Sequence, residues 1–184
     1  MRGVCTVLLC LAVLPGAGCG QNPATPSQSI TAAAPGTSTV RHEQETPFSG
    51  TVTGYLMLNM ANPEGCPAAP FTATIDATGT ALHMGHVIFN ARHCIHMQTG
   101  VIGSRALVIT AANGDEIHGS YSAQSGYPAP LDQPTHVNGT ITFDGGTGRF
   151  LNASGTAGLQ GWAISKPLGV PRPSQWEFKG TITY

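Results

Sequence analysis

Hydrophobic and polar side chains alternate with a period of two along most of the chain after residue 46, the pattern of half-buried β-strands. The alternation is clearest in segment 176–184 and recurs in the segments 48–58, 71–78, 117–121 and 137–143, while segment 105–112 is predicted as an apolar strand. A further extended region covers residues 80–97, where we expect two strands separated near residues 90–92. No segment has a convincing helical period, so the pattern predicts eight or nine antiparallel strands.

Two turns between these strands carry strong signals. Asn113-Gly114 favours a type I′ hairpin turn, which Asp115 is expected to fix. Segment 144–150, Asp-Gly-Gly-Thr-Gly-Arg-Phe, places three glycines within four residues, which permits positive φ in a tight turn or bulge. We expect Asp144 to pair with Arg149 across this turn, and Arg149 to stack on or cap neighbouring strands. A phosphate-binding loop would need a helix after the glycines, and no helical period follows.

Composition narrows the architecture and the partners. Only 9% of the 184 residues are charged, the formal net charge is −1, and the chain has 24 glycines and 14 prolines. Without a basic run, nucleic acid and acidic membrane surfaces are not expected partners. Glycines that recur inside strands favour a closed barrel over a sandwich, with the first and last strands as closing partners.

The N-terminal segment predicts export. Arg2 precedes a short apolar stretch at 4–14, and small residues follow, so residues 1–18 are interpreted as a signal peptide. Cys19 resembles the lipidated cysteine of a bacterial lipobox, although Gly16 stands where leucine is usual, so simple secretion is the alternative. Residues 19–45 have the composition of a disordered tether, and the barrel domain is expected at 46–184. The protein is thus expected in the cell envelope as a lipoprotein, or otherwise secreted.

Two cysteines remain after the signal peptide and the anchor are set aside. Cys66 lies in a proline-rich loop and Cys94 lies in or beside a strand. In an exported domain, two such cysteines most simply form a disulfide.

Several motifs together resemble those of exported bacterial proteins related to the allene oxide cyclase and dirigent superfamily. The motifs are His83-Met84-Gly85, the segments 111–116 and 145–150, Ala153-Ser154-Gly155 and the terminal segment 178–182. The resemblance spans residues 48–184 and implies an all-β fold, a single eight-stranded (eight to nine) antiparallel barrel of the calycin or allene oxide cyclase type with a hydrophobic cavity. The superfamily's plant catalytic positions do not match this chain residue by residue, so no catalytic residue is assigned.

Histidines are the main candidates for chemistry. His83, His86, His93 and His96 fall within fourteen residues, but each pair spaced by three would point to opposite faces of a strand. A metal site needs three or four converging ligands, so no metal and no cofactor is expected. His83, His96 and Arg149 are the candidates for a polar group inside the cavity.

Catalytic motifs do not add to this set. The sequence contains no Gly-x-Ser-x-Gly elbow, no His-Glu-x-x-His pair and no recognisable triad. We therefore expect a protein that binds a small apolar ligand or acts as a surface interaction module, with membrane attachment through the N-terminal lipid only. The alternative is a cyclase or isomerase that confines a reactive hydrophobic substrate. A histidine-based metal-binding protein is a third interpretation.

Overall fold

A computed structural model describes residues 44–60, 66, 69, 71–96, 98–126 and 130–184. The predictions for the signal peptide, for the anchor Cys19 and for all but the last two residues of the tether lie outside the described residues.

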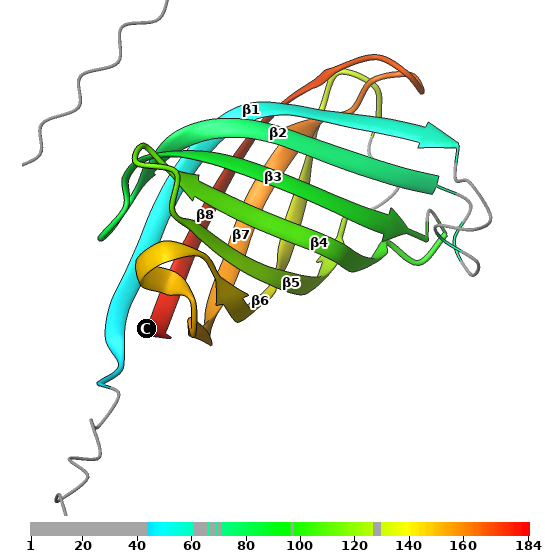
Figure 1. Ribbon diagram of the computed structural model, residues 1–184. Helices are drawn as coiled ribbons and strands as arrows, with labels where there is room; N and C mark the ends of the chain where they lie inside the picture. The colour runs from blue at the N-terminus through cyan, green and yellow to red at the C-terminus, as the bar shows by residue number, and fades with distance from the viewer. Residues whose placement is uncertain (1–43, 61–65, 67–68, 70, 97, 127–129) are drawn as a thin grey trace, which may run out of the picture. The chain divides into compact units, whose positions relative to one another are not determined.

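The described residues form a closed, eight-stranded antiparallel barrel in which each strand pairs with its neighbours in sequence and the last pairs with the first (Figure 1). The all-β barrel prediction is confirmed. The strands are β1 (Thr46–Met60), β2 (Phe71–Ala81), β3 (Gly85–Ile95), β4 (Val101–Ala111), β5 (Glu116–Ser125), β6 (Pro134–Gly146), β7 (Ser154–Ile164) and β8 (Arg172–Thr183).

Two local predictions are wrong. The break expected near residues 90–92 lies at 82–84 instead, because His83 adopts a positive φ of 68° and closes the turn between β2 and β3. The second concerns the glycine-rich segment 144–150, which was expected to contain no helix but ends in a short 3-10 helix, η1 (Gly148–Phe150). Within the described part of the chain, no helix has the length and apolar character needed to cross a bilayer.

The side chains that fill the interior of the barrel differ between its two ends. One end carries the β2–β3 and β4–β5 turns and η1 (Figure 1). Aromatic rings pack across the interior there, and we call it the phenylalanine end. Phe48 lies at its centre, with ring centroids 5.3 Å from Phe143 and 5.5 Å from Phe178. The opposite end, where β1, β3, β5 and β7 finish, is the loop end.

A disulfide joins Cys66, in the β1–β2 connection, to Cys94 in β3, with Cα atoms 5.6 Å apart. The predicted pairing is confirmed. The bond ties the loop end together directly beside the inward-facing residues of β3.

Glycines inside strands allow neighbouring backbones to approach closely, as the barrel prediction required. A Cβ at Gly54 would lie 2.1 Å from the carbonyl oxygen of Asp76, and one at Gly79 would lie 2.0 Å from that of Thr51. Both clashes are with backbone, so β1 and β2 could not coil together as they do with larger residues at these positions.

Candidate functional site

A small cavity of about 50 Å³ lies inside the loop end of the barrel. Every strand contributes to it, since alternate residues of each strand face inward. Its walls are mostly apolar, and its polar side chains come mainly from strand ends. The lining residues are Leu56, Leu58, Ala73, His93, Ile95, Ile102, Ser125, Thr135, Val137, Ala163, Ser165, Arg172 and Trp176.

His93 is the deepest ionisable group of this cavity, with only 1% of its surface exposed. The hydroxyl of Tyr121, in β5, shares a hydrogen bond of 2.5 Å with Nδ1 of His93. Burial lowers the pKa of His93 to about 4 and raises the pKa of Tyr121, so both side chains are neutral near pH 7. Among the described residues, no protein group bonds the second ring nitrogen, Nε2.

Other polar groups around the cavity are held by the protein itself. The indole nitrogen of Trp176 donates to Oγ of Ser174 at 3.1 Å, and Oγ of Ser125 donates to the carbonyl of Gly100 at 3.2 Å. Arg172 donates from Nη2 to the carbonyl of Lys166. The buried His93 imidazole is therefore one polar group available to a molecule in the cavity.

The three residues that the sequence suggested as ligand contacts do not come together, and none lines the cavity. His83 lies on the exposed β2–β3 turn at the phenylalanine end, with Nε2 3.0 Å from the carbonyl of Pro47. Arg149 lies on η1 at the same end. His96 follows β3 at the loop end and is half-buried.

His93 was not among those candidates, although the sequence carries a signal for it. Val87, Phe89, Ala91, His93 and Ile95 occupy alternate positions of β3, and all five are buried. Counting the alternation from Val87 places His93 inside the barrel, whereas comparing histidines only with one another does not reveal this.

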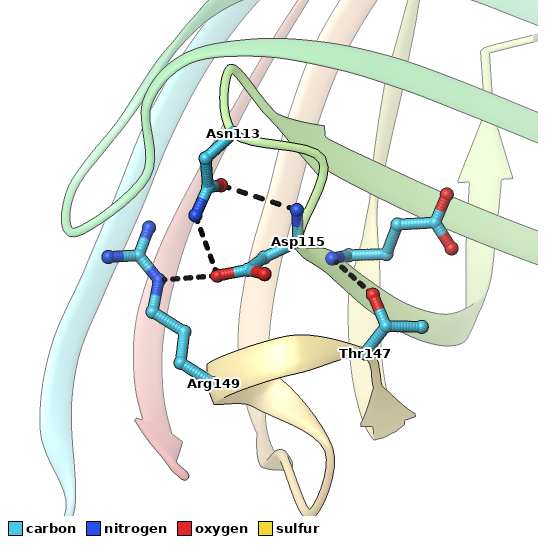
Figure 2. A network of polar contacts seen from close by, with 5 residues as sticks. Asn113, Asp115, Thr147 and Arg149 are labelled. Atoms are coloured by element: carbon cyan, nitrogen blue, oxygen red, sulfur yellow. Dashed lines mark hydrogen bonds and ion pairs between the residues drawn. The ribbon is translucent and has the colours of Figure 1, made fainter. Parts of the chain in front are cut away.

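Polar contacts at the phenylalanine end link the β4–β5 turn to η1 (Figure 2). Asn113 donates from Nδ2 to Oδ2 of Asp115 at 2.9 Å, and the amide of Asp115 donates to Oδ1 of Asn113 at 3.2 Å. The expected role of Asp115 in fixing this turn is confirmed. Arg149 pairs through Nε with Oδ2 of Asp115 at 3.4 Å, so the predicted pairing with Asp144 is wrong.

The surroundings of Arg149 support a structural role. Its guanidinium carbon lies 4.8 Å from the ring centroid of Phe150, which is buried. The backbone amide of Glu116 donates to Oγ1 of Thr147 at 2.9 Å and adds a second link between β5 and the glycine turn (Figure 2). These contacts bind the hairpin to η1 and leave Arg149 on the surface, away from the cavity.

A metal centre has no support in the described part of the chain, where no three His, Cys, Asp or Glu side chains gather closely enough to hold an ion. The carboxylate of Glu116 and Nε2 of His118 form a pair at 2.8 Å on the outer face of β5.

Fold and site together define an up-and-down antiparallel barrel with a small cavity of mixed polarity at one end. No protein-family model and no curated protein matches the chain. One solved structure that the chain resembles is that of the pterocarpan synthase dirigent protein GePTS1, with 11% sequence identity and a TM-score of 0.45 over 77% of this chain and 86% of that chain. At this level of similarity the match bears on neither ligand nor activity.

Proposed function

We propose that this barrel binds a small, largely apolar molecule at its loop end and hydrogen-bonds it through His93. The observation that carries the proposal is a buried, neutral imidazole facing a cavity whose other walls are mainly aliphatic. A few convergent polar groups in an apolar pocket are the usual composition of small-molecule sites.

The size of the cavity limits the ligand. A volume of about 50 Å³ holds a few water molecules, whereas pockets for drug-sized ligands measure about 300–1,000 Å³. The cavity therefore suits a very small molecule, or the end group of a longer one whose remainder extends through the loop end.

The chemistry of the end group follows from the protonation state of His93. A pKa near 4 keeps the imidazole neutral, so burying a charged group beside it would cost several kcal/mol without an opposite charge. An uncharged hydroxyl, of an alcohol or a phenol, can donate to the ring nitrogen at much lower cost. We expect preference for alcohols and phenols over amines, whose positive charge would add to that of Arg172 in the cavity lining.

The chain offers two tryptophans as built-in reporters, because Trp176 lines the cavity and Trp162 faces outward from β7. Phenol and 1-propanol are titrated into ¹⁵N-labelled protein, and the two indole N–H signals are followed by NMR. The Trp176 signal is expected to shift while the Trp162 signal stays in place. Ala163→Val, which fills the cavity, is expected to abolish the shift. The proposal is contradicted if neither phenol nor 1-propanol shifts the indole N–H signal of Trp176, or if the signal shifts equally in Ala163→Val.

Confinement of a reactive hydrophobic substrate, as in a cyclase or isomerase, is the second candidate function. The His93–Tyr121 pair is the observation that favours it, because it supplies a hydrogen-bonding group inside an apolar cavity. A general base works best with a pKa near the working pH, and a pKa of about 4 makes His93 a weak one. Binding is therefore the better supported function, and recovery of the bound molecule unchanged after long incubation would separate the two.

Attachment to a membrane through a lipidated Cys19 is part of the same proposal and rests on the sequence motif alone. Radiolabelled palmitate is expected to label the protein in bacterial cells, and Cys19→Ser is expected to remove the label. Labelling that persists in Cys19→Ser would place the lipid elsewhere, and an unlabelled wild-type protein would favour simple secretion.

A further inference from the structure

The outer surface of the barrel carries a long trough of about 780 Å³ that runs across five strands. Its course follows from the strand register, since β6, β7, β8, β1 and β2 are consecutive neighbours around the barrel. Five strands at a spacing of about 4.8 Å give the trough a length of about 19 Å. This site is separate from the interior cavity, with which it shares no lining residue.

One rim of the trough is a row of polar side chains in direct cross-strand register. The row consists of Asn138, Gln160, Glu177, Thr51 and Thr80. All five residues are exposed. The amides offer both donors and acceptors, the carboxylate accepts, and the hydroxyls do either, so the row can satisfy a ligand rich in hydroxyl groups.

The second rim is interrupted by a glycine. It consists of Gly158, Lys179, Ser49 and Leu82. Between the rims, the floor is the backbone of inward-facing residues whose amides and carbonyls belong to the barrel ladders. Gly158 has no side chain and leaves the trough open at β7.

A second, smaller depression of about 300 Å³ lies on the far side of the polar row. Its outer wall is the registered triplet of His136, Trp162 and Gln175. Gln175 donates to Oε1 of Glu177 at 3.3 Å, which links this wall to the polar row. The half-buried indole of Trp162 thus lies beside the amides as a flat apolar surface with a polar edge.

Charge and topology select the class of ligand. The charged side chains lining the trough are Glu177 and Lys179, which balance each other, so a polyanion gains no net attraction. A peptide cannot add as a strand, because the closed barrel exposes no strand edge. A protein interface would need an apolar centre, and among the described residues that line the trough Leu82 is the only exposed large aliphatic side chain.

We infer that this face binds an uncharged oligosaccharide or polysaccharide, lying across the strands between the two rims. Hydroxyl groups of successive sugar units meet the amides and the carboxylate of the polar row, and the Trp162 ring offers a stacking surface for a sugar that reaches the second depression.

Gly158 provides a test that leaves the core untouched. A Cβ at this position would lie 3.7 Å from the carbonyl oxygen of Lys179, an ordinary contact, so Gly158→Leu fills the trough without strain. Thr156→Leu is the matched control, since Thr156 is exposed on the same face of β7 but does not line the trough. Gln160→Ala removes one amide from the polar row and gives an independent variant should Gly158→Leu disturb the strand.

Affinity electrophoresis of the full chain is run in gels containing hydroxyethylcellulose, glycol chitin or galactomannan, with dextran sulfate as the anionic comparison. We expect retardation by at least one neutral polymer, weakened about tenfold in Gly158→Leu and Gln160→Ala and unchanged in Thr156→Leu. In NMR, an oligosaccharide of the retarding polymer should shift the indole signal of Trp162 and not that of Trp176. Retardation by none of the neutral polymers, by dextran sulfate alone, or equally in Gly158→Leu and wild type would overturn the inference.

Discussion

Protonation of His93 should make the stability of the barrel depend on pH between about 6.5 and 4. Burial lowers the pKa of His93 from 6.5 to about 4 in the folded protein, while the unfolded chain retains the ordinary value. Between these values the unfolded chain binds a proton that the folded protein does not, so the free energy of unfolding falls as the pH falls. The full loss is about 3 kcal/mol, and about 2 kcal/mol of it is expected between pH 7.5 and pH 5.

Urea unfolding of wild type and His93→Gln at a series of pH values measures the contribution of His93 protonation to the free energy of unfolding. Glutamine does not titrate, and its amide oxygen can accept the hydrogen bond of Tyr121. Carboxylates titrate in both proteins, so their contribution cancels in the difference between the two curves. The stability advantage of wild type over His93→Gln should shrink by about 2 kcal/mol from pH 7.5 to pH 5. Parallel curves over this range would refute the assignment of a buried, neutral His93.

Three further changes test the framework of the barrel. Cys94→Ser opens a disulfide that spans 28 residues and should lower the free energy of unfolding by about 3–4 kcal/mol, whereas an unchanged denaturation midpoint would show that the bond does not form. Gly54→Ala forces a Cβ against the backbone of β2 and should cost more than about 2 kcal/mol in urea unfolding, and a neutral effect would contradict the close approach. Asp115→Ala removes the partner of Arg149 and should cost about 1 kcal/mol, while Asp144→Ala should change the midpoint little, and the reverse order would restore the pairing predicted from the sequence.

The strands of this barrel could be predicted because its interior is apolar and its exterior polar. Period-two alternation then marks each strand, and the well-patterned first and last strands indicated closure, as the pairing of β1 with β8 shows. The hairpin at Asn113-Gly114 was also evident, but the predicted type I′ turn is wrong, because only Gly114 has a positive φ, 87°, and the turn closes by a hydrogen bond from the Gly114 amide to the carbonyl of Ala111. Strand alternation and turn dipeptides can be recognised in the sequence because each depends only on residues that are close together in the chain.

The site depended on contacts between distant residues, which no local pattern encodes. Arg149 meets Asp115 only because η1 folds under the β4–β5 turn, so the nearer carboxylate, Asp144, was the wrong choice. The turn at His83 was missed because a non-glycine residue adopts positive φ there. The size of the cavity depends on how side chains from all eight strands pack, and the sequence alone does not determine that volume.

The pairing of β1 with β8 has a kinetic consequence. Thr46 is the partner of Ile182. The strand β1 is synthesised first, but its hydrogen bonds to β8 can form only after β8, the last strand, has been synthesised. Non-local pairing of this kind slows folding, because a long chain segment must be ordered before the closing contacts form. Until β8 arrives, β1 and β7 both expose unpaired edges that favour association between chains. A nascent chain of this design cannot close its barrel until β8 has been synthesised, because the ladder of β1 is completed by the last strand of the chain.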